Sequence, residues 1–251
     1  GKNDGLKIWD VKTRQVVFAL KEQLACLAIS PTNEPLLAFS GGHPTSADFH
    51  VEISHFGGVR SGVYALQGAK NAWTAFHCHG GAFVSSGLDE YHFYAEIIAR
   101  QTGCRVVMPD YRLAPEHPYP AAPNDCFNAY CGLLDHGIPP ATIVLLGESC
   151  GGSLALGLLV RLRDAGLPLP ACFVSLTGWF DLSVSGEPVP GRDPFLTPQW
   201  VRNRGRNYLA GQLDLDDPRV SPAYADLRDL PPMYLQIGQH ADFAADAGGD
   251  F

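Results

Sequence analysis

One serine between glycines constrains the fold of this chain more than any other feature. The run 142–146 is almost wholly apolar, Gly147-Glu-Ser-Cys-Gly151 follows it directly, and residues 150–164 form a helical pattern rich in Leu and Ala. The pattern G-x-S-x-G between a strand and a helix is typical of a strained turn that lifts a serine hydroxyl clear of a sheet. An almost wholly apolar strand belongs at the centre of a covered sheet, so we expect Ser149 to lie at the end of such a strand.

The chain from about Ser46 onward alternates apolar strand-like runs with amphipathic helical stretches. Such alternation predicts an α/β fold with a central, mostly parallel sheet covered by helices. The stretch 181–230, rich in Pro, Asp and aromatic residues, is too long for a simple connection, and we expect a lid-like insertion there. Strands are predicted over residues 73–79, 104–108, 142–146, 171–176 and 232–237, and helices over residues 88–100, 123–135, 150–164 and around 200–209.

A second glycine-bearing segment, His79-Gly-Gly-Ala-Phe83, directly follows a predicted strand. Acyl transfer creates a tetrahedral oxyanion that preorganised backbone N–H groups stabilise, and glycines allow the backbone to approach closely. We therefore expect the N–H groups of Gly80, Gly81 and Cys150 to form an oxyanion hole beside Ser149. The alternative interpretation is an ordinary strand-to-helix turn.

Three motifs in a fixed order relate the chain to a known family. They are His79-Gly-Gly-Ala-Phe83, Asp110-Tyr-Arg-Leu-Ala-Pro-Glu-His-Pro-Tyr-Pro-Ala121 and Gly147-Glu-Ser-Cys-Gly-Gly152. From about Val51 to its end, the chain resembles the α/β-hydrolases of the hormone-sensitive lipase type. The family carries an H-G-G-G-like motif, then D-Y-R-L-A-P-E-x-x-x-P-A, then G-[DE]-S-A-G-G. The resemblance implies an α/β-hydrolase domain over residues 46–251, with Ser149 as nucleophile and without a cofactor.

The same resemblance implies a catalytic acid after the next-to-last strand. Asp242 is the best candidate for the acid that orients the catalytic histidine, whereas Asp246 is assigned to a helix N-terminus or a solvated carboxylate. The histidine should follow the acid in chain order, yet the chain ends at Phe251, nine residues after Asp242, and no histidine lies between them. We therefore expect the fold to be truncated before its last strand and helix, and the chain as given to be nearly inactive. His240, on the acid's own loop, is a poor substitute base.

Other residues of these motifs allow two interpretations each. Cys150 stands where the family usually has Ala, and its thiol is either a reactive cysteine at a helix N-terminus or a small buried filler, which we favour. His77 and His79 form an H-x-H pair, but glycines stand where metallo-hydrolases have Asp, so we expect no metal. We interpret His117 as a surface or packing histidine.

The first 45 residues follow a different pattern. Strand-like alternation covers residues 6–11, 15–20, 26–31 and 35–41, and the segment around the Trp9-Asp10 pair resembles the end of one WD repeat. A single blade cannot close a propeller, because each blade buries its faces only against its neighbours. Residues 1–45 are therefore either two ordinary hairpins or a WD-like piece of something longer. The start at Gly1 rather than Met is interpreted as a processed, tagged or truncated start.

Composition narrows the choice of partners. Hydrophobic residues make up 46% of the chain and charged residues 18%, which argues against wholesale disorder. The net charge of -8 provides no basic footprint for nucleic acid or anionic membrane. No apolar run reaches about 18 residues, so no membrane span is expected. Seven cysteines without a C-x-x-C pair are interpreted as reduced thiols of a cytoplasmic protein that opens without a signal peptide.

These features predict a serine carboxylesterase- or lipase-like hydrolase. We expect it to hydrolyse carboxylic esters with short or medium acyl chains, or lactones, through an acyl-enzyme on Ser149. Its partner is then a small-molecule ester or lactone. Two other interpretations stay open: a non-catalytic protein that binds a small ligand on the same scaffold, and an interaction fragment of WD type.

Overall fold

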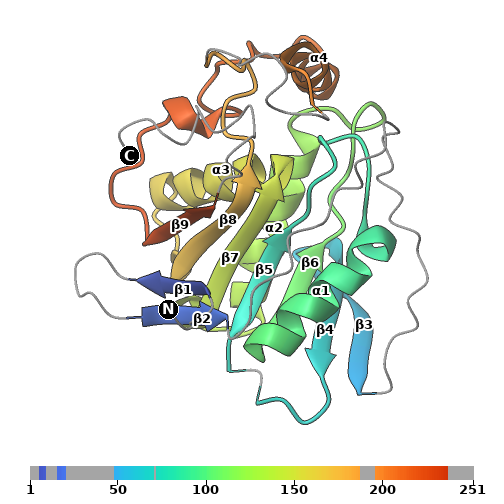
Figure 1. Cartoon of the computed structure of the whole chain (residues 1–251), viewed down its shortest axis with the longest axis vertical. Helices are drawn as coiled ribbons and strands as arrows, with labels where there is room; N and C mark the ends of the chain where they lie inside the picture. Colours follow the sequence, from blue (N-terminus) through green and yellow to red (C-terminus); the bar gives the residue numbers. More distant parts are fainter. Residues whose placement is uncertain (1–5, 10–15, 21–47, 71, 187–195, 237–251) are drawn as a thin grey trace, which may run out of the picture.

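A seven-stranded sheet forms the centre of the protein, with strand order β3-β4-β6-β5-β7-β8-β9 (Figure 1). The computed structural model describes residues 6–9, 16–20, 48–70, 72–186 and 196–236. Strands β6, β5, β7, β8 and β9 run parallel, and β3 and β4 add an antiparallel hairpin at one edge. The predicted mostly parallel sheet is therefore confirmed. The strands are β3 (Phe49–Phe56), β4 (Val59–Leu66), β5 (Thr74–Cys78), β6 (Arg105–Pro109), β7 (Ile143–Ser149), β8 (Cys172–Gly178) and β9 (Met233–Gln236).

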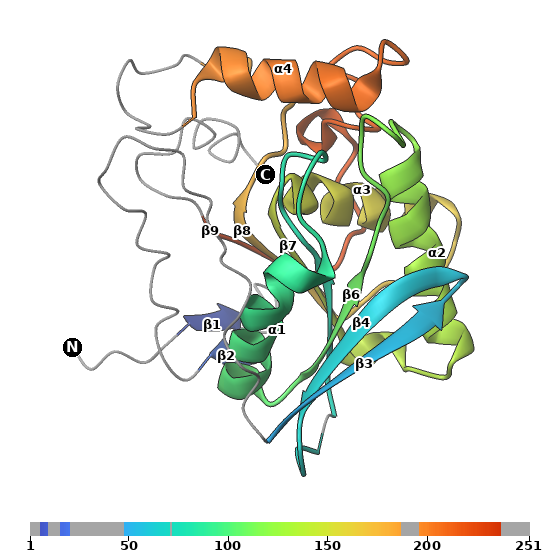
Figure 2. The ribbon, with the colours of Figure 1, turned by 90° about the vertical axis from the view of Figure 1, so that its right-hand side faces the viewer.

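Helices cover both faces of this sheet, on opposite sides in Figure 2. Helix α1 (Leu88–Thr102) packs against β4 and β6, whereas α2 (Ala121–Asp135) and α3 (Cys150–Asp164) pack together on the other face. All the helices and strands predicted from residue 73 onward are found, with ends shifted by a few residues. Helix α1 ends at Thr102, directly before Gly103, whose φ of 70° is the left-handed conformation that glycine adopts freely.

The side chains of the central strands explain why both faces are covered. Successive residues of a strand point to opposite faces, so Val106 and Met108 of β6 join the α1 cluster while Val107 joins the α2–α3 cluster. On β7, every residue from Ile143 to Gly147 is buried. Burying each large apolar side chain contributes about 1.5–3 kcal/mol, which fixes the register of these strands.

The hairpin of β3 and β4 was not predicted as two strands. Its turn is Gly57-Gly58, with φ of 56° and 79°, between Phe56 and Val59. A Gly-Gly pair between two alternating runs is a hairpin signal that the sequence carried. A Cβ on Gly57 would lie 2.0 Å from the carbonyl oxygen of Asn128 on α2, so the turn is also a packing contact.

The predicted lid-like insertion is described at residues 181–186 and 196–230. It contains α4 (Pro198–Leu209) and the 3-10 turn η2 (Pro222–Tyr224), and Figure 1 shows α4 beyond the carboxyl ends of β7 and β8. Thr197 caps α4 by accepting the Trp200 N–H at 3.2 Å. A further 3-10 turn, η1 (Pro140–Thr142), precedes β7.

Before residue 48, the structure describes only β1 (Leu6–Trp9) and β2 (Val16–Leu20), paired as an antiparallel two-stranded sheet. These strands agree with the first two of the predicted runs. The runs 26–31 and 35–41 lie outside the described residues. The choice between ordinary hairpins and a WD-like piece therefore still rests on the sequence alone.

Candidate active site

Ser149 sits at a strained turn between β7 and α3. Its φ of 50° and ψ of -127° are unusual for a residue with a side chain, as the sharp turn predicted for it requires. Glycines on either side make the turn possible by close packing. A Cβ on Gly151 would lie 2.1 Å from the Cys78 carbonyl oxygen, and one on Gly147 would lie 2.4 Å from the Gly151 carbonyl oxygen. These contacts are with backbone, which cannot give way, so only glycine fits at either position.

The loop from His79 to Phe83 follows β5 and lies against this turn. A Cβ on Gly80 would be 3.3 Å from the Cβ of Ser149, so the loop backbone approaches the serine closely. The first peptide of the loop is held from both sides. The Tyr111 hydroxyl donates to the His79 carbonyl at 2.7 Å, and the Gly80 N–H donates to Glu148 Oε1 at 3.1 Å and to the Tyr91 hydroxyl at 3.2 Å.

The second peptide of the loop is oriented by the His79 side chain. Its Nδ1 lies 2.7 Å from the Gly80 carbonyl oxygen, so Nδ1 carries the proton and donates it. The imidazole is itself stacked on Tyr111, with ring centroids 4.1 Å apart and planes 13° apart. Because a trans peptide places its C=O and N–H on opposite sides, holding the Gly80 oxygen also sets the direction of the Gly81 N–H.

The third peptide of the loop is fixed by the turn that follows it. The Gly81 carbonyl accepts the Val84 and Ser85 N–H groups at 3.1 Å each and the Ser85 hydroxyl at 3.0 Å. Gly81 has a φ of 117°, and a Cβ there would lie 2.1 Å from the Ser85 carbonyl oxygen. A side chain at this position would therefore displace the loop.

Two N–H groups remain open at the point where the loop meets the turn. Within the described part of the chain, the N–H groups of Gly81 and Cys150 find no acceptor, whereas that of Gly80 has two. The Gly80 N–H is engaged by Glu148 and Tyr91 in this structure, and its expected role in an oxyanion hole stays a prediction. The expectations for Gly81 and Cys150 stay predictions that this geometry permits.

The ionisable groups around the loop are shifted mainly by burial. Burial lowers the pKa of His79 to about 4, against the opposing effect of its hydrogen bond to Gly80, and lowers that of His77 to about 3. Both imidazoles are therefore neutral at physiological pH. Burial raises the pKa of Glu148, although its hydrogen bonds to Tyr91 and Gly80 act in the opposite direction.

None of the described histidines hydrogen-bonds to the Ser149 hydroxyl, for which the described residues provide no partner. His117 is exposed, as expected for a surface histidine. The predicted acid Asp242 lies outside the described residues, as do Asp246 and His240. No group of three or more His, Cys, Asp or Glu side chains converges as a metal site in the part of the chain that the structure describes. In that part, no helix is long and apolar enough to span a membrane.

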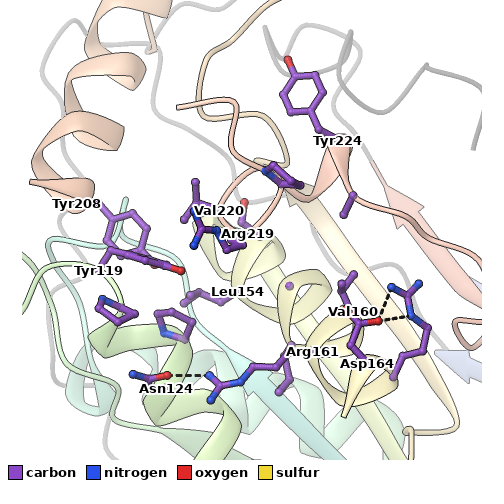
Figure 3. A pocket seen from close by; sticks show the side chains of 18 of the residues that line it. Tyr119, Asn124, Leu154, Val160, Arg161, Asp164, Tyr208, Arg219, Val220 and Tyr224 are labelled. Carbon is purple, nitrogen blue, oxygen red and sulfur yellow. Dashed lines mark hydrogen bonds and ion pairs between the residues drawn. The ribbon is translucent and has the colours of Figure 1, made fainter. Parts of the chain in front are cut away.

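A cavity of about 650 Å³ runs along the outer face of α3 (Figure 3). Phe83 and Tyr208 line one end, while Arg161 and Asp164 line it farther along the helix. Figure 3 shows Arg161 joined to Asn124, a 2.8 Å hydrogen bond across the cavity wall. Ser149 is not among the residues that line this cavity, whereas Phe83 of the loop beside it is.

Sequence reasoning missed the side chains that hold the loop. Glu148 and Tyr91 come from β7 and α1, far apart in the sequence, and Tyr111 belongs to the Asp110–Ala121 motif. Tyr111 supports the loop through the His79 carbonyl and ring. The available signal was the glutamate between Gly147 and Ser149, because a carboxylate at a strand end can accept an N–H from a neighbouring loop.

Comparisons with known proteins agree with the fold. Residues 75–248 match the family model described as the alpha/beta hydrolase fold. The chain is 34% identical over 218 residues to an esterase of Acinetobacter venetianus, covering 86% of this chain and 71% of the esterase. It is 36% identical over 177 residues to an acetyl-hydrolase of Streptomyces hygroscopicus, covering 69% of this chain and 59% of the acetyl-hydrolase.

Solved structures show the same likeness. The crystal structure of an esterase from the bacterial hormone-sensitive lipase family is 38% identical, with a TM-score of 0.77, over 81% of this chain and 69% of that one. An esterase/lipase from an uncultured bacterium is 30% identical, also with a TM-score of 0.77, over 88% of this chain and 77% of that one.

Proposed function

The chain belongs to the α/β-hydrolase family, in its hormone-sensitive lipase branch, and from this premise we propose that it hydrolyses carboxylic esters through an acyl-enzyme on Ser149. The substrates are small esters with short or medium acyl chains, or lactones. The names of the relatives, an esterase and an acetyl-hydrolase, support ester hydrolysis and the smaller acyl groups. The chain spans only 59% of the length of the acetyl-hydrolase, so the activity of a whole protein is part of the proposal.

One observation carries the proposal. A serine held at a φ of 50° lies beside two backbone N–H groups, of Gly81 and Cys150, that have no acceptor among the described residues. Cys150 is fully buried and Gly81 partly buried, and buried N–H groups are nearly always paired, so two open donors beside a strained serine favour an oxygen atom supplied by a ligand. A tetrahedral oxyanion is the oxygen that such a pair stabilises best.

In the proposed reaction, Ser149 Oγ attacks the acyl carbon of the ester and loses its proton to a base. The carbonyl oxygen becomes an oxyanion that accepts the Gly81 and Cys150 N–H groups. Collapse of the intermediate breaks the bond to the alkoxy oxygen, which leaves as the alcohol after taking the proton. Water then attacks the acyl-enzyme in the same way, releasing the carboxylic acid and restoring Ser149.

We propose that the base is none of the described histidines. His79 uses its Nδ1 proton to hold Gly80 and is stacked on Tyr111, and His77 is fully buried with a pKa of about 3. A base and its orienting acid, for which Asp242 stays our candidate, must therefore come from residues that the structure does not describe. Without a base, Ser149 is a weak nucleophile, so this proposal also implies a low rate for any form of the protein that lacks one.

Hydrolysis of p-nitrophenyl butyrate by the wild type and by Ser149→Ala tests the proposal. We expect the release of p-nitrophenol above background to disappear in the variant, while its circular dichroism spectrum stays unchanged. The difference between the two proteins is decisive, whatever the absolute rate of the wild type. Equal rates for both proteins would show that the ester is cleaved elsewhere or only by solvent.

A further inference from the structure

The proposed reaction uses the backbone N–H of Cys150 but gives no role to its side chain. It is the first residue of α3, directly after Ser149, and its side chain is 0% exposed. Its sulfur lies against the loop from His79 to Phe83, which we call the oxyanion loop, and accepts the N–H of Phe83 at 3.3 Å. The residue therefore contacts the loop with its side chain while its own N–H stays open beside Ser149.

The part of the loop that this sulfur holds is under backbone strain. Ala82 and Phe83 have φ of 54° and 64°, left-handed values that residues with side chains seldom adopt. Such a conformation persists only where the surroundings over-determine it. Three contacts hold Phe83 in this conformation. Its N–H donates to the Cys150 sulfur, its carbonyl accepts the Ala114 N–H at 2.9 Å, and its ring stacks on Tyr208 with centroids 3.9 Å apart.

The hydrogen bond to sulfur is the one contact among these three that ties the loop to the nucleophile's helix. The Ala114 and Tyr208 contacts lead to the segment after β6 and to α4, respectively. On the basis of the proposed function, we propose that Cys150 is a positioning residue: its thiol sets the spacing between the oxyanion loop and α3, so that the Gly81 and Cys150 N–H groups converge on one oxyanion.

The chemistry of a neutral thiol suits this role. A thiolate beside a developing oxyanion would repel it, and burial raises the pKa of Cys150 to about 12, which keeps the group protonated. A reactive cysteine needs the opposite environment, exposed and electropositive. The small-filler interpretation accounts for the burial but not for the buried Phe83 N–H, which would be left without an acceptor if an alanine stood at this position.

Three variants of the full chain test this proposal. Cys150→Ala removes the acceptor, Cys150→Ser keeps an acceptor on a shorter bond, and Cys172→Ala is the matched control. Cys172 is equally buried, but it starts β8 opposite Val144, at the far end of the parallel strands from Ser149. Removing it creates a cavity of the same size without touching the loop.

Kinetics with p-nitrophenyl butyrate give the first readout. We expect Cys150→Ala to lower kcat about 10-fold to 100-fold with KM within about twofold of the wild type, because misplaced oxyanion donors act on the transition state. Cys150→Ser should recover part of this loss, and Cys172→Ala should keep the wild-type kcat. Equal kcat values for Cys150→Ala and wild type, or equal losses in Cys150→Ala and Cys172→Ala, would overturn the proposal.

Hydrogen–deuterium exchange gives a second readout that needs no activity. In Cys150→Ala we expect faster exchange in the peptide that contains Phe83, with unchanged exchange in the second half of α3. Unchanged exchange at Phe83 would overturn the role of Cys150 even if the enzyme is active. If the wild type and Ser149→Ala cleave the ester at the same rate while exchange at Phe83 still depends on Cys150, the tether stands and the proposed function fails.

Discussion

The two turns that meet at the carboxyl ends of β5 and β7 are held in different ways. At the turn around Ser149, glycines pack directly against backbone atoms, and the sharp φ of the serine follows from that packing. The first two peptides of the loop from His79 to Phe83 are held instead by side chains, because Tyr111 and Glu148 bond to the first and His79 bonds to the second. The third peptide is fixed by backbone N–H groups of the following turn. Steric exclusion places Ser149, the proposed nucleophile, and hydrogen bonds orient the peptides that carry the proposed oxyanion donors.

The turn around Ser149 and the loop from His79 to Phe83 should therefore tolerate different substitutions. Packing against backbone leaves no room for adjustment, so changes at the serine turn should act on folding. Hydrogen bonds from side chains can be removed one at a time, so changes around the loop should act on the rate before they act on stability.

Adding one methyl group to each turn should give the largest contrast. In Gly151→Ala the new Cβ meets the Cys78 carbonyl at 2.1 Å, whereas in Gly80→Ala the nearest atoms are the side-chain ends of Glu148 at 2.5 Å and Tyr91 at 2.9 Å. We expect Gly151→Ala to lower the free energy of unfolding by more than ~3 kcal/mol or to prevent folding, and Gly80→Ala by about 1 kcal/mol. Urea unfolding measures both, and similar losses would refute the contrast.

Removing the His79 hydrogen bond, which orients the Gly81 N–H, should have the next largest effect, and it should act on kcat. His79→Phe keeps the aromatic stack on Tyr111 but loses the Nδ1 hydrogen bond to Gly80, so we expect kcat to fall about 10-fold to 100-fold at constant KM. His77→Phe is the matched control. His77 is also fully buried two residues earlier, yet neither ring nitrogen has a partner among the described residues. If both variants lose kcat equally, the His79 hydrogen bond does not aim the donor.

The acceptor for the Gly80 N–H should matter less. Glu148→Ala leaves that N–H with only the Tyr91 hydroxyl, and we expect it to lower the free energy of unfolding by about 1–3 kcal/mol. Glu148→Gln keeps a carbonyl acceptor in the same place and should cost less than ~1 kcal/mol. Urea unfolding at pH 7 compares the two variants, and equal costs would mean that the carboxyl group itself, rather than an acceptor, is required.

The smallest effect concerns pH. The pKa of His77 is about 3 in the folded protein and near 6.5 when unfolded, so the unfolded chain binds more protons between these values and stability falls as pH falls below about 6.5. Glu148, whose pKa is raised, acts in the opposite direction, since its contribution is lost as pH rises through its folded pKa. We expect His77→Phe to remove about 1 kcal/mol of the stability loss between pH 7.5 and 5.5. An unchanged loss in urea unfolding would show that His77 charges in the folded state.

The sequence was informative where geometry follows from residue type. Local glycines and an apolar strand predicted the turn at Ser149, because only one backbone path satisfies Gly147-Glu-Ser-Cys-Gly151 after a buried strand. The helices and strands from residue 73 onward followed from periodicity and turn residues for the same reason. The β3–β4 hairpin was missed although its Gly57-Gly58 turn was visible.

The arrangement of the donors could not be predicted in this way. Which N–H of a glycine loop stays open depends on partners from distant elements, such as Tyr91 of α1 and Tyr111 after β6. A pattern of H-G-G shows that the backbone can approach but not which peptide is already engaged, so the hydrogen bonds of the Gly80 N–H to Glu148 and Tyr91 could not be predicted. The sulfur contact of Cys150 likewise appears only once Phe83 is placed above it.

Covalent labelling tests whether Ser149 is the reactive serine of this protein. A fluorophosphonate probe is incubated with the wild type and with Ser149→Ala for several hours, and the modified peptide is identified by mass spectrometry. We predict one phosphonyl group, on Ser149 alone, and no modification of the variant, because the open Gly81 and Cys150 N–H groups favour reaction at that oxygen. Labelling at another residue, or an unmodified Ser149 after prolonged incubation, would contradict the account.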